Sequence, residues 1–349
     1  MGRSGVLLKS ERAGLAPELV LYPGSALGAK LDVAGIALLA AWVMWVQGYS
    51  GFGRWEEAAV GAIACAGALA GAHYVTAIAR QAVPVAVTAW LLVTFAWDPL
   101  GALSTSPTSG PLGYSNAKGA LFVQGIAAGL MLWRVAPTRL RGFIGVVAAG
   151  VFAVVPWASR SMAAAVLLGL VVIGAFVTKE RLRAWVVCCA AMILLSFGVT
   201  ALLGWTSDDR GAAVGGNRAN LWRDSVNLLT ENPVTGVGPG RFKTESPTAA
   251  SDRDLRWAHS VFLQSGAEFG IVGLVLALCL AMWPLARLAT LPWSPAVAIA
   301  VGAVAALLVH ACIDYVMRFP EVPLATAALV GYAIASSETV RFTTRVGRR

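Results

Sequence analysis

The stretch Ala184–Gly204, AWVVCCAAMILLSFGVTALLG, is apolar along nearly its whole length and contains no charged residue. A helix needs about 20 mostly apolar residues to cross the hydrocarbon core of a bilayer. The basic residues Lys179, Arg181 and Arg183 lie directly before this stretch, as is typical of the cytoplasmic end of a spanning helix. The stretch therefore predicts a transmembrane helix.

The whole chain has the same apolar character. Its 349 residues are 58% hydrophobic and only 13% charged, whereas about a quarter of the residues of a soluble domain are charged. Its mean hydropathy is +0.71. The five cysteines lie inside apolar runs without a CxxC spacing, which indicates packing roles and predicts no metal site. This composition excludes a soluble enzyme, a disordered chain and a disulfide-rich secreted domain.

Apolar runs recur along the sequence and predict an all-α polytopic membrane protein with about ten transmembrane helices. One long extracytoplasmic loop, carrying short interfacial helices, is expected between helices seven and eight. The predicted spans are Leu31–Val46, Ala58–Ala79, Ala82–Trp97, Ala117–Trp133, Gly142–Ala158, Met162–Val177, Ala184–Gly204, Phe269–Ala286, Pro295–Ile313 and Pro323–Ser336.

Basic residues predict how the chain is oriented. Most of the 27 Lys and Arg fall into alternate short loops and the two terminal segments, which predicts that both termini are cytoplasmic. We expect no cleaved signal peptide and a multi-pass protein of the bacterial cytoplasmic (inner) membrane. The predicted organisation is a cytoplasmic segment at 1–30, helices one to seven at 31–204, an extracytoplasmic loop at 205–258, helices eight to ten at 259–336 and a basic cytoplasmic tail at 337–349.

The long loop at 205–258 holds seven acidic and seven basic residues, so it is not a polybasic lipid-binding patch. Its apolar residues from Leu221 onward have helical spacing, which predicts an amphipathic helix beginning near Asn217. Arg218 and Trp222 share one face of this helix, which is expected to lie on the outer membrane surface with Trp222 at the level of the lipid headgroups. An ordinary interfacial helix with a snorkelling arginine is the alternative interpretation.

Two other segments flank the membrane on the same side. The glycines of Gly236-Val237-Gly238-Pro239-Gly240 favour a tight turn over an anion-binding nest. From His259 a helical pattern runs to Ala286, which predicts one continuous helix about 42 Å long at 1.5 Å per residue. This exceeds the bilayer core of about 30 Å, so His259 should stand on the aqueous side and a partnered Glu268 near the interface.

Three charged or titratable residues stand near the outer ends of predicted spans. Arg160 occupies a very short outer turn, where it either binds an anion or snorkels. His310 and Asp314 are four residues apart at the end of the ninth span. This pair either relays protons or orients a substrate, or it is a satisfied polar contact between helices, which we favour.

The order of these features resembles the O-antigen ligase superfamily, which includes O-antigen ligases, O-antigen polymerases and pilin-type oligosaccharyltransferases. The resemblance spans roughly 113 to 336, and one difference is Ser260, where the family usually has Asn after the His. The matching motifs are Gly113-Tyr114-Ser115-Asn116, Ser159-Arg160-Ser161, Arg218-Ala219-Asn220-Leu221-Trp222, the block from Glu231 to Phe242, the segment Ala258 to Gly270, and His310 to Asp314.

The resemblance implies a GT-C-type glycosyltransferase that acts at the outer membrane face with inversion and without a cofactor or metal. The glycan would pass from a polyprenyl diphosphate donor to the hydroxyl of a lipid or glycan acceptor. The implied base is His259, and the implied diphosphate ligands are Arg160, Arg218 and Arg241. Supporting roles are expected for Asn116, Trp222, Gly238, Gly240, Glu268, His310 and Asp314.

The sequence leaves other functions open. A polymerase of the same superfamily would extend one lipid-linked glycan with another. A small-anion transporter would need charges at the membrane midplane, but His73 is the only Asp, Glu, Lys, Arg or His well inside the first eight predicted spans. Membrane lipids are expected to surround the protein, nucleic acid is not an expected partner, and the sequence does not indicate an oligomeric state.

Overall fold

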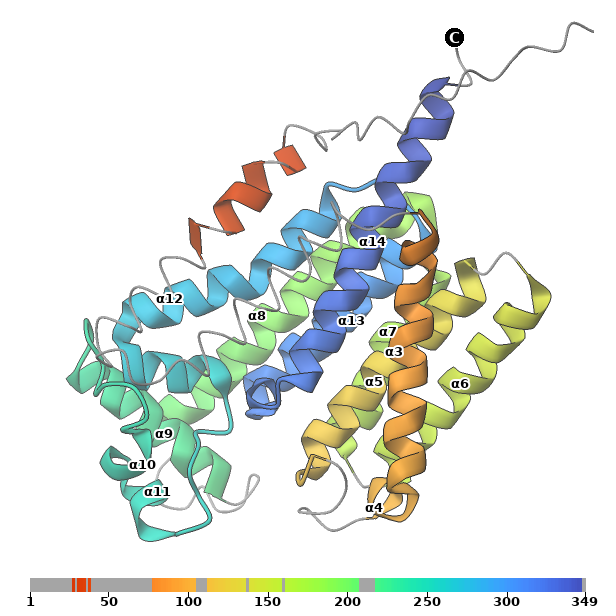
Figure 1. The fold of residues 1–349 in the computed structure, drawn as a ribbon. Coiled ribbons are helices and arrows are strands. Elements are labelled where there is room, and N and C mark those ends of the chain that lie inside the picture. The colour runs from red at the N-terminus through yellow and green to blue at the C-terminus, as the bar shows by residue number, and fades with distance from the viewer. Residues whose placement is uncertain are drawn as a thin grey trace, which may run out of the picture.

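A computed structural model of the chain describes residues 27–28, 30–35, 37–38, 77–104, 112–135, 138–158, 161–206 and 217–346. All of its regular elements in these ranges are helices (Figure 1). They are α3 (Ala77–Trp97), α4 (Pro99–Leu103), α5 (Ser115–Val135), α6 (Arg139–Ala158), α7 (Met162–Phe176), η1 (Lys179–Arg181), α8 (Leu182–Thr206), α9 (Asn217–Glu231), α10 (Phe242–Glu245), α11 (Pro247–Ser251), α12 (Val261–Ala289), α13 (Pro295–Ile313), η3 (Val316–Arg318) and α14 (Glu321–Val346), besides short helical stretches within 27–38.

Within the described ranges, four helical stretches are long and apolar enough to cross a membrane: Arg139–Ala158, Lys179–Thr206, Val261–Ala289 and Pro295–Ile313. Shorter apolar stretches lie at Pro84–Thr94, Met162–Phe176 and Glu321–Ser337. The described part of the chain is therefore all-helical, and its candidate spans are those of a membrane protein. Most of the first two predicted spans lies outside the described residues, so the expected total of ten stays a prediction.

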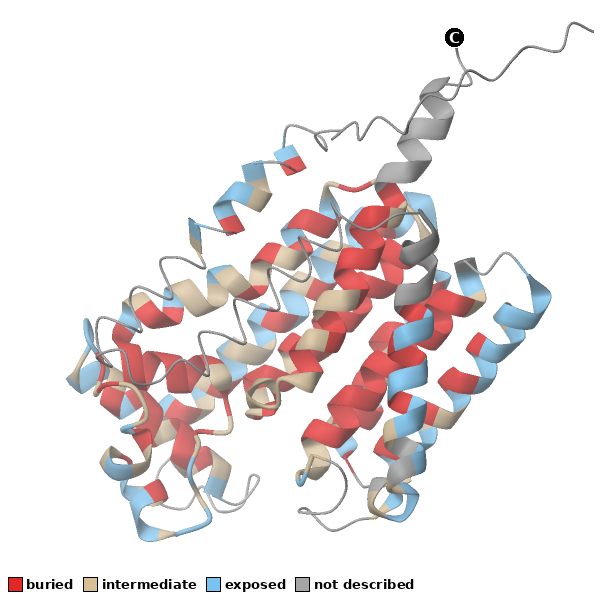
Figure 2. Ribbon diagram, in the orientation of Figure 1, coloured by how far each residue is buried: buried red, intermediate tan, exposed pale blue. Residues whose placement is uncertain are grey.

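Helix α13 forms the centre of the core and packs against α5, α7, α8, α12 and α14. Figure 2 shows α13 and α5 largely buried, whereas α6 and the described part of α3 turn exposed side chains outward. Small residues let the central helices approach closely: a Cβ on Gly302 would come 2.5 Å from the Leu170 carbonyl oxygen, and one on Gly174 would come 2.6 Å from that of Ala298. Close packing at small residues is how helices associate where lipid removes the hydrophobic driving force.

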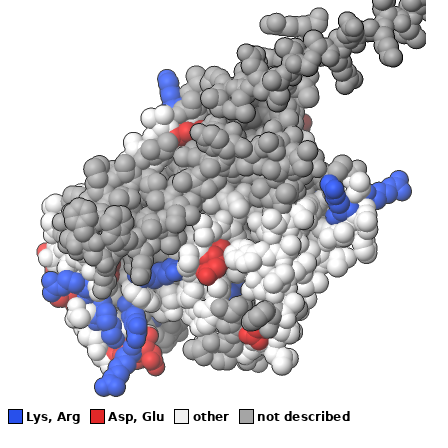
Figure 3. Space-filling model, in the orientation of Figure 1, with Lys and Arg blue, Asp and Glu red and all other residues white. Residues whose placement is uncertain are grey.

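The outer helices expose large apolar side chains. In α6 and α8 they include Phe143, Val147, Leu195 and Leu202, each about half exposed or more. A soluble monomer avoids so broad an apolar surface, whereas a lipid-facing surface requires it. Figure 3 shows most of the drawn Lys and Arg at the two ends of the molecule, and those near α9–α11 are mixed with Asp and Glu.

Helix α12 differs from the continuous helix predicted from His259 to Ala286. Gly270 has φ 69° and ψ −167°, so the helix is broken there and its first part ends near Phe269. Ile271 N–H donates to the Pro233 carbonyl at 2.7 Å instead of to its own helix. The sequence prediction was wrong at this point. The backbone groups freed by the break are hydrogen-bonded by a loop that is distant in sequence, and the apolar run itself gives no signal of this.

The segments near the two ends of the chain pack as follows. Helix α14 extends to Val346, so the segment predicted as a basic tail from residue 337 is helical over most of its length. Near the other end of the chain, Trp283 Nε1–H donates to the Leu31 carbonyl at 2.7 Å, and Arg287 pairs with Asp32 at 2.9 Å. These contacts attach the described residues at 27–38 to the second half of α12.

Candidate functional site

The carboxylate of Asp314 is the centre of a polar cluster. Helix α13 ends at Ile313, and Asp314 follows in extended conformation with a side chain that is fully buried. Its Oδ2 accepts from Asn116 Nδ2 at 2.6 Å and from Arg218 Nη2 at 2.9 Å. Its Oδ1 accepts from the backbone N–H of Tyr315 at 2.7 Å. The buried charge is thus surrounded by donors, as it must be to remain stable.

Tyr114 and His259 complete this cluster. The Tyr114 hydroxyl lies 2.9 Å from each carboxylate oxygen of Asp314. His259 Nδ1 lies 3.5 Å from Oδ1, within ion-pair distance but longer than an ordinary hydrogen bond. Burial raises the pKa of Asp314, but its interactions with His259, Arg218 and His310 outweigh this effect and lower it from 3.8 to about 2. The carboxylate is therefore ionised at neutral pH.

The hydroxyl of Tyr114 acts as a donor. Burial, followed by the negative charge of Asp314, raises the pKa of this tyrosine, so it keeps its proton. Asn116, in the first turn of α5, also donates to the Tyr114 oxygen at 3.2 Å, while its own Oδ1 accepts from Ser161 Oγ at 3.2 Å. Ser161 directly precedes α7. The start of α5, the start of α7 and the end of α13 are thereby joined through side chains.

His259 lies before α12, not within the helix as predicted. Its φ of 51° is the only positive value found for a non-glycine residue in the described ranges. Such a conformation is strained, and strain of this kind concentrates at functional sites. Trp222 Nε1–H donates to the His259 carbonyl at 3.1 Å. The His259 side chain keeps 16% of its surface exposed, so it is largely but not fully buried.

Ser260 starts the helix that follows. Its buried Oγ accepts from the Leu263 N–H at 3.3 Å, which caps the N-terminus of α12. The preceding Ala258 N–H donates to Gln264 Oε1 at 3.2 Å. Serine and asparagine cap helices about equally well. Ser260 therefore caps α12 as an asparagine at this position could.

Arg218 and Trp222 are brought into the site by α9, which packs on α8 and α12. The helix itself was predicted, but Trp222 is only 7% exposed and packs with Val226 and Leu263. Trp222 is therefore buried against protein side chains, whereas its level relative to the lipid headgroups stays a prediction. The Arg218 side chain is 33% exposed while its Nη2 pairs with the buried Asp314 at 2.9 Å.

Three aromatic rings stack beside the carboxylate. Tyr114 stacks on Tyr315 with ring centroids 4.7 Å apart, and on Phe319 at 5.5 Å. Tyr315 also meets the His259 ring edge-on at 4.8 Å. Aromatic pairs in such geometries stabilise a site beyond the area they bury. The imidazole therefore contacts the ring of Tyr315 and also lies close to the carboxylate of Asp314.

The glycine-rich loop is a structural turn against α12. Val237 N–H donates to the Ala267 carbonyl and Gly238 N–H to that of Glu268, each at 2.9 Å. Gly236, Gly238 and Gly240 all have positive φ. The amides of Val237 and Gly238 therefore satisfy carbonyls freed by the break at Gly270 instead of forming an anion nest. This agrees with the tight turn favoured by the sequence.

The remaining predicted residues lie at different distances from this centre. Glu268 is 2% exposed and accepts from Gln264 Nε2 at 3.1 Å. Arg241 pairs with Glu245 on α10 and is 63% exposed, and within the described ranges no contact joins it to Asp314. Arg160 lies outside the described residues, although the neighbouring Ser161 belongs to the cluster.

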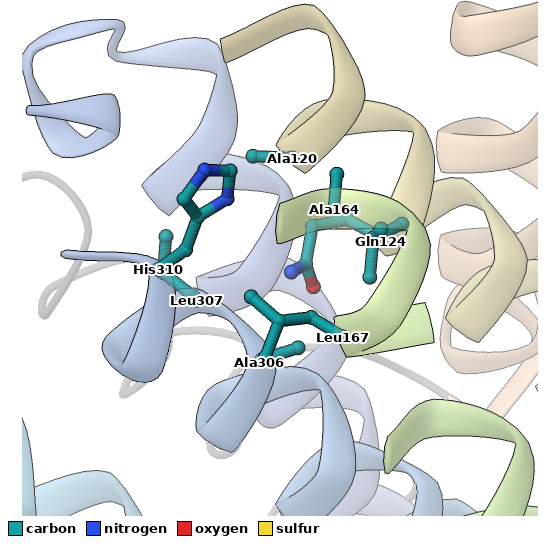
Figure 4. A pocket seen from close by; sticks show the side chains of 8 residues that line it. Ala120, Gln124, Ala164, Leu167, Ala306, Leu307 and His310 are labelled. Carbon is teal, nitrogen blue, oxygen red and sulfur yellow. The ribbon is translucent and has the colours of Figure 1, made fainter. Parts of the chain in front are cut away.

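His310 lies one turn deeper in α13 and is 1% exposed. It lines a small hollow together with Gln124 and six aliphatic side chains (Figure 4). His310 Nε2 and Gln124 Oε1 are buried without a protein hydrogen-bond partner among the described residues. The Gln124 amide donates to the Ala303 carbonyl at 3.3 Å. His310 thus lines this buried hollow and is not among the side chains that hydrogen-bond to Asp314.

Sequence reasoning underrated two tyrosines and the aspartate. Tyr114 belongs to the motif Gly113-Tyr114-Ser115-Asn116 and Tyr315 follows Asp314, and these positions were the available signals. The favoured interpretation of Asp314, a contact between helices with His310, missed its four side-chain partners. Within the described parts of the chain, no group of three or more His, Cys, Asp and Glu is arranged to hold a metal ion.

Residues 145–278 match the model of a protein family described as O-antigen ligase. The matched segment includes Ser161, Arg218 and His259, whereas Tyr114, Asn116 and Asp314 lie outside it. A comparison with curated proteins found no match.

Proposed function

We propose that this chain moves a glycan from a polyprenyl diphosphate to an acceptor hydroxyl, because its residues 145–278 match the model of the O-antigen ligase family, a family of glycan-transferring enzymes. His259 acts as the base, and Arg218 and Arg160 hold the diphosphate. The reaction inverts the configuration of the transferred sugar. The acceptor is a lipid or another glycan.

The observation that carries this proposal is the sharing of one carboxylate. Asp314 lies 3.5 Å from His259 Nδ1 and 2.9 Å from Arg218 Nη2. A carboxylate beside Nδ1 favours the tautomer with its proton on Nδ1, which leaves Nε2 able to accept one. The same carboxylate fixes the guanidinium. Base and cation are therefore positioned by a single buried group.

The positive charge of the arginines can stabilise a departing diphosphate. When the acceptor oxygen attacks the anomeric carbon, the bond to the diphosphate breaks and negative charge develops on the leaving group. Arginine stabilises such charge well because its guanidinium is planar, always protonated and able to bind two oxygens. The proton of the acceptor hydroxyl passes to His259, whose conjugate acid is stabilised by Asp314.

The position of the site relative to the membrane follows from the predicted topology. The pattern of basic loops places both termini in the cytoplasm and 205–258 outside. The cluster then faces the extracytoplasmic side of the inner membrane. The prenyl chain of the donor remains in the lipid, which accounts for a transferase site at the end of apolar helices.

The experiment is transfer from a purified glycan-bearing polyprenyl diphosphate in detergent or proteoliposomes. His259→Asn is the most informative variant because asparagine tolerates positive φ, so the fold is retained while the base is lost. We expect transfer to fall by about 100-fold or more. Near-normal transfer by folded His259→Asn would overturn the mechanism, and no transfer by the wild-type protein with any donor would overturn the function.

Product length distinguishes the two forms of the proposal. A single addition to the acceptor indicates a ligase, whereas a ladder of repeat units on the lipid indicates a polymerase.

Arg256→Gln serves as the control for the His259 variant. Arg256 is an exposed cation three residues before His259, and the structure shows no contact between it and Asp314. Its transfer rate should stay within about twofold of wild type, as for most surface substitutions.

A further inference from the structure

Three backbone carbonyl groups converge on the ammonium of Lys243. This lysine lies in the short helix α10, directly after the fully buried Phe242. Its Nζ donates to the carbonyls of Ala249 and Asp252, each at 2.5 Å, and to that of Leu255 at 2.9 Å. A lysine ammonium has three N–H donors and no acceptor. All three donors of Lys243 are therefore matched by oxygens of the protein itself.

These carbonyls lie along the segment that leads to His259. Residues 252–260, between α11 and α12, form neither helix nor strand, so no regular ladder of backbone hydrogen bonds holds them. The position of such a segment depends on its other contacts. Two of the three carbonyls, those of Asp252 and Leu255, belong to it. Lys243 therefore gathers the backbone that precedes His259 around one charge.

The same part of the loop has an apolar core. Phe242, adjacent to Lys243, and Ala258, adjacent to His259, are both 0% exposed and belong to one buried cluster. The cluster takes residues from α9, α10, α11 and α12, namely Leu221, Leu228, Phe242, Ala249, Ala258 and Ala267. The lysine and the residue before His259 are thus parts of one packed unit.

Asp224 ties this unit to α9. Its side chain is 4% exposed, and Oδ2 accepts from Ser246 Oγ at 2.5 Å and from the Thr248 N–H at 2.8 Å. Helix α11 packs on both α9 and α10 (Figure 1). Because α9 also carries Arg218, the segment before His259 is anchored on the helix that supplies the arginine of the site.

The conformation of His259 gives this anchoring a consequence for chemistry. Its φ of 51° is strained, and strained residues persist only where the surrounding structure holds them. Ser260 holds the following residues by capping α12, and Trp222 holds the His259 carbonyl. The preceding residues are held by the unit that Lys243 organises. Since a displacement of about 1 Å can cost about 100-fold in rate, loosening this unit should affect the base.

Resting on the function proposed above, we infer that Lys243 is a positioning residue for glycan transfer. Its ammonium organises the segment before His259 and thereby sets the place of the base. It acts through His259 and not as a ligand of the donor diphosphate, because its N–H groups already bond to carbonyls. A direct contact with the diphosphate is the competing interpretation, and donor binding distinguishes the two.

The first test compares kcat with donor binding in Lys243→Ala. We expect kcat to fall by about tenfold or more while the affinity for glycan-free polyprenyl diphosphate stays within about twofold, because the change acts on the base. Arg218, the proposed diphosphate ligand, is held separately by Asp314. Lys179→Ala, at an exposed position in η1, is the matched control and should leave both quantities unchanged.

The second test is chemical rescue. The substitution Lys243→Ala removes three carbons and the ammonium, which n-propylammonium matches in length and in its three N–H donors. Adding n-propylammonium should therefore raise the kcat of Lys243→Ala, whereas tetramethylammonium, which has the charge but no N–H, should not. Lys243→Met fills most of the space with a side chain that has no donor, so its kcat should be low and should not respond to the amine.

The third test reports on the segment without any need for transfer. Arg253 and Arg256 are exposed, and trypsin cleaves after arginine only where the backbone opens. Cleavage at these two residues should be about tenfold faster or more in Lys243→Ala than in the wild-type protein, since proteolysis follows the population of the open form. The addition of n-propylammonium should slow it again.

Several outcomes would overturn the inference. These are an unchanged kcat in Lys243→Ala, a loss of diphosphate binding with kcat retained, or an equal response of Lys243→Ala and Lys243→Met to n-propylammonium. If thermal unfolding shows that Lys243→Ala does not fold, the kcat and trypsin cleavage of Lys243→Met decide. A wild-type protein that transfers no glycan would contradict the proposed function, whereas unchanged trypsin cleavage in Lys243→Ala would contradict this inference alone.

Discussion

Asp314 Oδ1 lies 3.5 Å from His259 Nδ1, and the same carboxylate binds Arg218 through its other oxygen. The aspartate follows the end of α13, the histidine precedes α12, and the arginine lies in the first turn of α9. Three helix ends therefore meet at one buried charge. The positions of the neighbouring side chains depend on that carboxylate.

Asp314→Asn should reduce transfer by about 100-fold or more. The amide keeps nearly the same shape but removes the charge that holds Arg218 and stabilises a protonated His259. Steady-state kinetics on the folded variant measure the effect, which should fall mainly on kcat. Asp254→Asn, at an exposed position, is the matched control. Equal rates for the two variants would remove Asp314 from the mechanism.

The stability of the protein should depend on the charge of Asp314 at low pH. The pKa of this group is about 2 in the folded protein, below its ordinary value of 3.8. The unfolded chain therefore takes up the proton first, so the stabilisation is present above pH 4 and is lost as pH falls toward 2. Thermal unfolding in detergent should show the gap between wild type and Asp314→Asn narrowing below pH 4. A gap that stays constant down to pH 3 would contradict this assignment.

Tyr114→Phe should lower activity moderately while keeping the fold. The substitution removes a hydroxyl that lies 2.9 Å from both oxygens of Asp314 but retains the ring that stacks on Tyr315 and Phe319. A hydrogen bond to a charged group is worth about 1.5–3 kcal/mol, so a loss in kcat of roughly 10- to 150-fold is expected if the full contribution is felt in the transition state. Tyr332→Phe, a buried tyrosine within α14, should leave kcat unchanged. Tyr114→Ala should lose more than Tyr114→Phe because it also removes the stack.

Gly270→Ala should lower the free energy of unfolding by more than about 1 kcal/mol, the usual cost of a residue poorly suited to a helix. Gly270 has φ 69°, and a Cβ there would lie 2.8 Å from the Pro233 carbonyl oxygen and closer still to that of Val234. Thermal unfolding measures the change. Gly150→Ala in α6 is the control, because a Cβ there meets nothing within 4 Å and alanine favours a helix. If both substitutions lower the melting temperature equally, the break at Gly270 is not a structural requirement.

Much of the fold could be predicted from sequence because it depends on local properties. An uncharged run such as Ala184–Gly204 must be buried in lipid or protein, and Pro295–Ile313 was predicted with the bounds that α13 has. The amphipathic helix at α9 followed from its spacing. The break at Gly270 could not be predicted, because it depends on amides from residues 237 and 238 that reach α12 only after folding.

The same division holds for the site. The sequence by itself determined that the chain is an apolar helical membrane protein and that His259, Arg218 and Asp314 were candidates for function. Only the tertiary structure decided that His259, Arg218, Tyr114 and Asn116 all surround the carboxylate of Asp314. It also showed that Arg241 pairs with Glu245 instead. Hydropathy can be read from each residue along the chain. The partners of a buried charge, in contrast, depend on which helix ends come together when α5, α9, α12 and α13 pack.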